Sequence, residues 1–470
     1  MSIHILDDDS LLHLFSAYRP PIFDGDERDG LSIMGGKEWD RELWWYKLAH
    51  VCRRWRGLIL GSASYLGVCL VCTYDAPISN MLAHSPPLPL VIDYAGDDRD
   101  ISAEDEEGIV LALAQRNRVR RVRLRTPVLK LQRFVVAMDE EYPVLEYLIL
   151  VPSEDGEGLV LRERLQAPHL RHLVLEGFAL PIGPRLLTTA VGLTMLAIVA
   201  PLPSSYFEPN ILLQWLSYMP QLEKLLVTIL FPVPDQDVER QLKHTPITTQ
   251  VALPNLRWFV FRGVSAYMEA VVRRITAPRL EKLGIRLFEQ LTFSVPRLLQ
   301  FMSTIEDFGF NSAKFVFGEE DVHVEVHPRE EAKMNVFQMH IDCWHLDWQV
   351  SSMAQIFNTL SQIFSAVEHL ALEHEDHSRS SEEQHHEVDH ANWRKLLRSF
   401  NNVKSLHVDD GLVEKLARSL LLGDGELPPE LLPELQEVAY SGSDDTGDAF
   451  TSFIDARQSA GHPVTLMRLE

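Results

Sequence analysis

One short pattern of apolar positions recurs from the first third of the chain to its end. It reads apolar, two other residues, apolar, one other residue, apolar. Successive occurrences lie 23 to 36 residues apart, and a period of that size indicates a stacked array of repeats. The last two apolar positions alternate with a polar one, which predicts a short strand with one buried face. The occurrences begin at Val119, Leu145, Leu170, Leu193, Leu222, Leu256, Leu280, Ile305, Met334, Val367, Val403, Leu435 and Val464.

Several of these expected strands follow a segment with the apolar spacing of an amphipathic helix. Such segments occupy residues 211–220, 266–275, 353–364 and 392–400. Each repeat is therefore interpreted as helix, turn and strand. Stacking such repeats predicts an α/β fold over residues 116–470, a curved solenoid with a parallel sheet inside and helices outside. Residues 64–115 are expected to be a connecting segment, with the first irregular repeats as the alternative.

The first 63 residues have a different pattern, which predicts a small helical domain. Residues 7–20 predict a short helix with acid in its first turn, ended by a Pro–Pro pair. From Leu48 to Ile59 the apolar residues follow one continuous helical face, and Gly61 is placed to end that helix. Residues 20–40 are rich in Gly and Asp and predict an inserted loop.

Composition narrows the function classes. The 470 residues include 67 acidic and 44 basic ones, for a net charge of −23, which disfavours nucleic acid as a partner. Two stretches without charge, residues 57–74 and 186–207, are broken by Gly, Ser or Pro, so no membrane partner is expected. An acidic start without an apolar run argues against a signal peptide, and only four Cys favour a reducing compartment. A cytoplasmic or nuclear location is expected.

Two N-terminal segments resemble the F-box family. "LDDDSLLHLF" (residues 6–15) is similar to the first F-box helix, and "LAHVCRRWRGL" (residues 48–58) to the helix that carries the Leu-x-x-Val-Cys-Arg-x-Trp pattern. An F-box followed by repeats that resemble irregular leucine-rich repeats, with "PPLPLVIDY" (residues 86–94) between them, is similar to a large group of fungal F-box proteins. Asp7 stands where the family prefers Pro, and the inserted loop is longer than usual.

The resemblance implies a substrate-recognition adaptor of a Skp–cullin–F-box ubiquitin ligase, with no enzymatic activity of its own. The N-terminal helices would bind the Skp adaptor, and through it the cullin machinery, while the repeats hold an unknown target protein. The alternative is a repeat scaffold with a degenerate F-box, which Asp7 and the loop favour. The residues that would form the F-box core or the Skp-facing surface are Leu6, Leu11, Leu12, Leu14, Phe15, Leu48, Val51 and Trp55.

Residues between the apolar positions of each strand are expected on the concave face, where a target would bind. They are basic in the first repeats, aromatic and basic in the middle and acidic at the end, and an acidic or phosphorylated peptide would suit the basic part. The alternative is that a solvated strand face simply carries charges. The candidate residues are Arg121, Arg123, Arg125, Tyr147, His172, Trp258, Arg262, Lys282 and Arg286.

The sequence contains no group of residues typical of a particular reaction, so neither catalytic residues nor a cofactor are expected. The acidic, His-rich segment 373–390 contains His386 and His390, four residues apart, which could share a helix face and bind a divalent metal. A solvated loop between two repeats is the preferred interpretation, without a metal. The pair Cys69 and Cys72 has CxxC spacing, but on a strand these side chains point to opposite faces and are expected in the core.

Overall fold

The computed structural model describes most of the chain, which falls into two compact units. Unit 1 comprises Met1–Phe207 and Tyr218–Leu222, and unit 2 comprises Glu208–Ser217 and Glu223–Glu470. The described residues are 6–20, 43–95, 99–154, 156–181, 183–230, 249–288, 290, 292–306, 309–328, 336–375, 390–420, 431–442 and 447–469. Residues 21–42, which include all but the first residue of the predicted loop 20–40, lie outside these ranges, as does the His-rich stretch 376–389.

The described residues at the start of unit 1 form four short helices. They are α1 (Asp8–Tyr18), α3 (Trp44–Ala49), α4 (Arg53–Gly61) and α5 (Ala63–Leu66). α1 confirms the predicted N-terminal helix, with acidic residues in its first turn. The prediction of one continuous helix from residue 48 to 59 is wrong. Cys52 is the N-cap of a new helix, α4, and its Sγ accepts a hydrogen bond from the backbone N–H of Trp55 at 3.5 Å.

The rest of unit 1 alternates helices and strands. All its strands pair in parallel, in the order β1-β2-β3-β4-β5-β6. Residues 64–115 therefore already contribute strands to the array. The elements are β1 (Leu70–Cys72), α6 (Ile78–His84), β2 (Leu90–Tyr94), α7 (Ala103–Leu113), β3 (Val119–Thr126), α8 (Val128–Ala137), β4 (Tyr147–Pro152), β5 (His172–Glu176), α9 (Arg185–Thr189), β6 (Met195–Ala200) and the 3-10 turn η2 (Pro203–Ser205).

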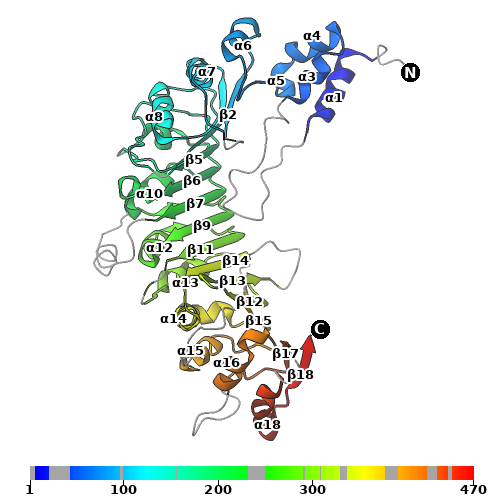
Figure 1. The fold of residues 1–470 in the computed structure, drawn as a ribbon, viewed down its shortest axis with the longest axis vertical. Coiled ribbons are helices and arrows are strands. Elements are labelled where there is room, and N and C mark those ends of the chain that lie inside the picture. The colour runs from blue at the N-terminus through cyan, green and yellow to red at the C-terminus, as the bar shows by residue number, and fades with distance from the viewer. Residues whose placement is uncertain are drawn as a thin grey trace. The chain divides into compact units, whose positions relative to one another are not determined.

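Unit 2 continues the same plan, with helices on one face of its strands (Figure 1). Its main sheet has the order β7-β9-β11-β14-β13-β12-β15-β16-β17-β18, and β8 and β10 form a separate parallel pair. The strands are β7 (Lys224–Ile229), β8 (Val251–Ala252), β9 (Trp258–Gly263), β10 (Ile275–Thr276), β11 (Lys282–Leu287), β12 (Ser312–Phe317), β13 (Asp321–His327), β14 (Val336–Asp342), β15 (His369–His374), β16 (Ser405–Val408), β17 (Glu437–Ser441) and β18 (Thr465–Leu469). The helices are α10 (Pro209–Leu216), α12 (Ser265–Val272), α13 (Pro296–Met302), α14 (Leu346–Phe364), α15 (His390–Leu397), α16 (Asp410–Leu420), η4 (Asp448–Phe450) and α18 (Thr451–Ser459).

The repeat pattern gives the strand starts closely. At Leu145, Leu170, Leu193, Leu222, Leu256, Leu280, Val367, Val403 and Leu435 the strand begins two residues after the first apolar position. In these nine occurrences the first apolar residue is buried beside the strand and the next two are buried on one face, whereas Met467 and Leu469 of the occurrence at Val464 are exposed. The mixed α/β fold with a mainly parallel sheet in each unit is thus as expected.

One expected strand is wrong. The described residues of the occurrence at Ile305 form a turn and coil, and β12 begins only at Ser312. The chain then forms β13 antiparallel to β12 and β14 antiparallel to β13 before it returns beside β11. An all-parallel sheet is therefore also wrong for unit 2. A tight turn brings β13 back beside β12, whereas a parallel neighbour would require a crossover connection.

Aromatic side chains hold β12 under the helices. Phe315 contacts Phe357 of α14 at a ring-centroid distance of 5.0 Å and Phe400 at 5.7 Å. Phe317 lies 5.4 Å from the ring of Trp393 on α15. All five side chains are fully buried. This dense packing fixes the irregular three-strand segment in the same layer as the regular repeats.

Gln349 of α14 is the polar counterpart of that packing. Its side-chain amide Nε2 donates to the carbonyl oxygens of Gly318 at 2.8 Å, Asp321 at 3.2 Å and Cys343 at 2.8 Å. The side chain is buried. A single amide therefore joins the turn between β12 and β13 to the end of β14.

We expect Gln349→Leu to destabilise this part of unit 2 by about 1–3 kcal/mol, because buried carbonyl groups lose their donor. The measurement is hydrogen exchange of the backbone amides of residues 318–343. Gln362→Leu on the exposed side of the same helix is the control and should leave these rates unchanged. Equal rates in both variants would show that the Gln349 amide does not stabilise the segment.

Candidate protein-binding surfaces

The N-terminal helices of unit 1 pack through a small aromatic core. Phe15 of α1 meets Trp55 of α4 edge to face, with ring centroids 4.9 Å apart. Leu11 is fully buried beside them. At the surface, Nη2 of Arg54 donates to Asp8 Oδ1 at 2.6 Å and to the carbonyl of Leu6 at 2.7 Å. These contacts fix α1 against α4.

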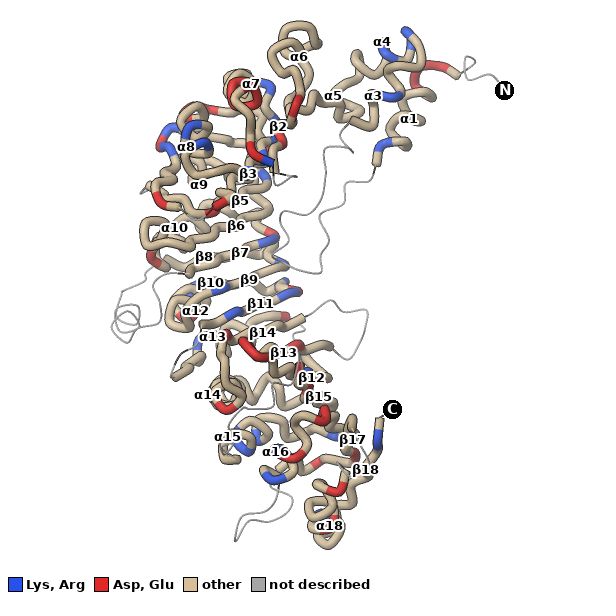
Figure 2. Tube along the Cα trace, viewed as in Figure 1, with Lys and Arg blue, Asp and Glu red and all other residues tan. Residues whose placement is uncertain are grey.

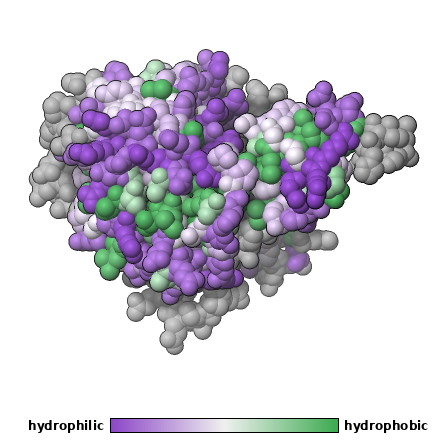
Figure 3. All heavy atoms as spheres, turned by 90° about the horizontal axis from the view of Figure 1, so that it is seen from above, coloured by the Kyte–Doolittle hydropathy of each residue, from purple (hydrophilic) through white to green (hydrophobic). Residues whose placement is uncertain are grey.

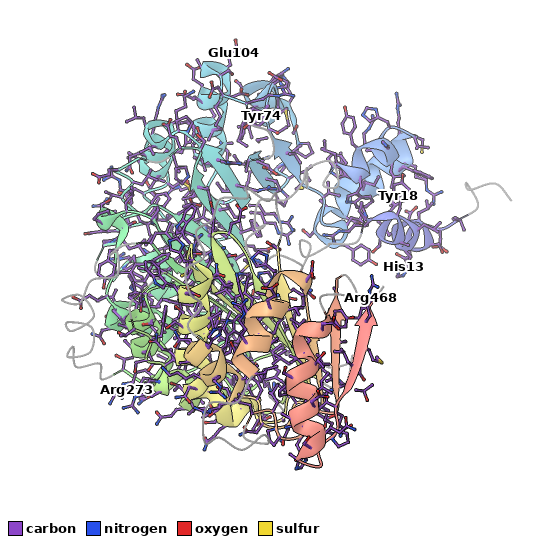
Figure 4. The ribbon with its side chains drawn as sticks, turned by 60° about the horizontal axis from the view of Figure 1, so that its bottom comes forward. His13, Tyr18, Tyr74, Glu104, Arg273 and Arg468 are labelled. Carbon is purple, nitrogen blue, oxygen red and sulfur yellow. The ribbon has the colours of Figure 1, made fainter. Side chains whose placement is uncertain are left out.

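The eight residues that the F-box resemblance selects divide into three groups. Leu11 and Phe15 are buried. Leu6, Leu12, Leu48 and Trp55 are half-buried. Leu14 and Val51 are 49% and 58% exposed, as are two nearby tyrosines, Tyr18 at 57% and Tyr46 at 54%. Figure 4 labels His13 and Tyr18 on the outside of α1. The small bundle therefore has both a core and exposed apolar side chains.

Asp7 begins α1. Its carboxylate accepts the backbone N–H of Ser10 at 2.7 Å, which is the usual geometry of a helix N-cap. The hydrogen bonds from the backbone and hydroxyl of Ser10 lower the pKa of the Asp7 carboxyl below its usual value. The departure from Pro at this position thus leaves a well-formed helix start.

Leu43 and Trp45 attach these helices to the sheet of unit 1. Leu43 packs against Cys69, Val71 and Val91. The indole Nε1 of Trp45, which is buried, donates to the carbonyl of Cys69 at 3.2 Å. The helices are therefore packed on the first strands of the array.

In unit 1 the structure brings three predicted target-binding residues into one row. Arg121, Tyr147 and His172 are register partners on β3, β4 and β5. The rings of Tyr147 and His172 are stacked, with centroids 5.2 Å apart, and all three side chains are half-buried. Arg125 lies on the same strand as Arg121 and is exposed.

Arg123 is placed differently from the expectation. It is 4% exposed, and its Nη1 lies 3.7 Å from Oδ2 of Asp93, which is 5% exposed. Burial raises the pKa of the Asp93 carboxyl, and the Arg123 charge opposes that rise. Because both side chains are buried and each compensates the charge of the other, neither can contact a partner protein. We therefore leave Arg123 out of any binding surface.

In unit 2 the side chains of two lysines contact the ring of one tryptophan. Lys224, Trp258 and Lys282 are register neighbours on β7, β9 and β11. The Nζ atoms of the two lysines lie 4.6 Å and 5.0 Å from the centroid of the Trp258 ring. Each contact is a cation–π interaction of about 0.5–1 kcal/mol at a partly exposed site.

A charged network lies four residues farther along the same strands, where Arg262 is the register partner of Arg286. Nη2 of Arg286 lies 2.6 Å from Asp342 Oδ1 and 3.5 Å from Asp321 Oδ2, and Arg262 lies 3.8 Å from Asp342. His340, the register partner of Arg286, stacks on His323 with ring centroids 5.3 Å apart. Basic and acidic residues both lie along the strands of this unit (Figure 2).

The network shifts several pKa values. His340, whose Nδ1 lies 3.9 Å from Asp321 Oδ2, lowers the pKa of Asp321 despite partial burial. Burial, and then the charge of His340, lower the pKa of His323. His327, whose Nε2 lies 3.8 Å from Glu325 Oε2, lowers the pKa of Glu325 to about 2, although burial opposes it. Burial lowers the pKa of Arg262. Asp321 on β13 and Asp342 on β14 pair with Arg262 and Arg286 and so largely balance their positive charges.

Sequence reasoning did not find these carboxylates and histidines. β13 has the alternating burial of a half-exposed strand. The alternation of His and Glu on one face was the available signal. It could not reveal that β14 returns beside β13 and aligns His340 with His323.

Other features predicted from the sequence have plainer outcomes. All four cysteines are free, Cys69 and Cys72 are buried, and burial raises the pKa of Cys72 to about 12. Within the described ranges, no three His, Cys, Asp or Glu side chains group as metal ligands would. Within those ranges too, no helix is long and apolar enough to cross a membrane. On the face shown in Figure 3, hydrophilic residues predominate, and hydrophobic residues form separate patches among them.

Comparisons with known proteins give little beyond this. No family model matches the chain, and no curated protein matches it significantly. Among solved structures, the chain is similar to the leucine-rich repeat-containing protein LegL7 from Legionella pneumophila. The identity is 10%, the match covers 85% of this chain and 99% of that one, and the TM-score is 0.24. A likeness this distant carries no functional argument, and the F-box resemblance and fungal kinship stay predictions.

The depressed pKa of Glu325 predicts a specific acid sensitivity. A carboxyl whose folded pKa lies below its unfolded value of 4.5 stabilises the fold above about pH 4.5, and that stabilisation is lost as pH falls towards about 2. We expect Glu325→Gln to lower the thermal unfolding midpoint at pH 7 and to have a smaller effect at pH 3. A deficit of the same size at both pH values would contradict the assignment. Glu414→Gln, at an exposed position on α16, is the control.

Proposed function

We propose that the chain is a non-enzymatic adaptor of a Skp–cullin–F-box ubiquitin ligase. In this proposal α1, α3 and α4 dock on the Skp adaptor, and the repeats hold a target protein. The observation that carries it is the arrangement of Leu14 and Val51. Both are exposed aliphatic side chains, Leu14 on α1 and Val51 in the turn between α3 and α4, beside a core in which Phe15 packs against Trp55. Exposed apolar residues on a rigid support are typical of a protein-docking surface.

The alternative, a repeat scaffold that does not bind the Skp adaptor, was favoured by Asp7 and by the inserted loop. Asp7 does not disturb the helix, because its carboxylate caps the first turn. The loop 21–42 lies outside the described residues and gives no argument either way. The N-terminal helices thus give no structural reason to prefer the scaffold, and binding of the Skp adaptor distinguishes the two functions.

We expect Leu14→Asp and Val51→Asp each to weaken binding of the Skp adaptor by about 30-fold, the effect of losing about 2 kcal/mol at a docking hot spot. The measurement is titration of the purified full chain with the purified Skp adaptor. The control is Leu129→Asp on α8, a leucine that is 85% exposed in the same unit. The wild-type chain must bind, and failure of the wild type to bind would leave the scaffold as the function.

The target-binding part of the proposal rests on the row Lys224, Trp258 and Lys282. A half-buried Trp between two lysines combines apolar contact area with positive charge, which suits an acidic or phosphorylated peptide. The cations of the neighbouring network are less available for such a peptide, because Arg262 and Arg286 are paired with Asp342. We therefore place the anion-binding function on the two lysines.

We expect Trp258→Ala and Lys282→Glu to reduce recovery of crosslinked target proteins from cells by at least about tenfold, the effect of losing about 1.4 kcal/mol. The readout is quantitative mass spectrometry of proteins crosslinked to the full chain. Arg257→Glu is the matched control, because Arg257 precedes β9 and its side chain is 60% exposed. An unchanged set of crosslinked proteins in the Trp258 and Lys282 variants would exclude this row as the target surface.

A further inference from the structure

Two exposed tryptophans lie close together in unit 2, away from the Trp258 row. Trp344 follows β14 and is 64% exposed, and Trp348 lies in the first turn of α14 and is 55% exposed. The ring of His345 meets that of Trp348 edge to face, with centroids 5.2 Å apart. Large aromatic side chains are seldom left in water to this extent on a monomer, and Trp is enriched among binding hot spots.

The backbone beneath these tryptophans is fixed. Gln349, next to Trp348, holds the carbonyls of Gly318, Asp321 and Cys343 through one buried amide. The backbone N–H of Cys343 also donates to the carbonyl of Glu320 at 2.8 Å. Both tryptophans are therefore presented from a rigid junction, which reduces the entropy lost when a partner binds.

The surroundings of the two tryptophans are acidic. Glu319 and Glu320 are exposed on the turn between β12 and β13, and the bond from Cys343 places Glu320 beside the chain that leads to Trp344. The carboxylate of Glu375 borders the same turn, since a Cβ atom on Gly318 would lie 3.5 Å from Glu375 Oε2. Arg286, the cation of the network at this edge, is already paired with Asp321 and Asp342. Three glutamates therefore lie on or beside this turn, and the arginine at this edge is already paired.

We propose that Trp344 and Trp348, together with Glu319, Glu320 and Glu375, bind an arginine- or lysine-rich segment of a partner protein. A guanidinium or ammonium group lies over the indole face, where the ring quadrupole attracts it. Neighbouring side chains of the same segment pair with the carboxylates. An acidic peptide or a nucleic acid is repelled by those carboxylates, and a purely apolar partner leaves them without compensation. The proposal does not depend on the Skp adaptor or on the Lys224–Trp258–Lys282 row.

The experiment titrates the full chain with a fluorescein-labelled peptide in which Arg alternates with Gly, followed by fluorescence anisotropy. Peptides in which Glu or Leu replaces Arg are the comparison probes. We expect saturable binding of the Arg peptide only. Trp344→Ala and Trp348→Ala should each weaken it by about 2- to 30-fold, the range of one cation–π contact. Glu319→Lys combined with Glu320→Lys should weaken it by at least about tenfold and reduce its salt dependence.

Because the chain carries a net charge of −23, a matched control separates local from general attraction. Glu414→Lys combined with Asp455→Lys changes the net charge equally at exposed sites on α16 and α18, and it should bind the peptide like the wild type. Hydrogen exchange of residues 318–343 verifies that each variant keeps the fold. The proposal is wrong if the Arg peptide does not saturate, if the Leu peptide binds equally well, or if the control variant loses as much affinity as the Glu319 and Glu320 variant.

Discussion

The in-register parallel pairing of short strands is the constraint on which the rest of this structure depends. Each strand must satisfy its backbone groups on both neighbours and bury one face under helices, so its apolar positions are fixed by the pleat. A shift of one residue would expose that face. The apolar positions at Leu225 and Val227 of β7, and at Phe259 and Phe261 of β9, are buried for this reason. On the opposite face Ile149, Val174 and Leu226 are buried as well. Only its half-buried positions, such as Tyr147 and Trp258, are free of this requirement and can serve binding.

The polar residues on the strand face that points away from the helices have different partners along the chain. In unit 1 the pair Arg123 and Asp93 is buried, and this polar pair is not available to a partner. In unit 2 the carboxylates of β13 and β14 neutralise Arg262 and Arg286, whereas Lys224 and Lys282 use the ring of Trp258 instead. The face that the sequence predicts to be basic in its first and middle repeats therefore divides into paired cations and more available ones.

Much of the array was predictable because the information is local. The spacing of apolar residues around Leu222 or Leu280 gives the strand, its start and its buried face. Ile305 shows the limit, because its residues have the same spacing but form a turn. Only the aromatic packing of Phe315 against α14 and the return of β14 beside β11 decide which segment enters the sheet. These contacts join residues that lie far apart in the chain, so they cannot be predicted from a short segment of the sequence.

The N-terminal helices show the same limit on a smaller scale. Apolar periodicity continues across His50 to Cys52, yet the helix breaks there and Val51 becomes exposed. The break has a physical cause at the other end of the segment. Leu43 packs against residues in and around β1, and the indole of Trp45 donates to the carbonyl of Cys69, just before that strand. α4 packs against α1 through the contact of Trp55 with Phe15. A straight helix would have to serve both contacts from one face, whereas two short helices serve them separately and leave the residue between them exposed.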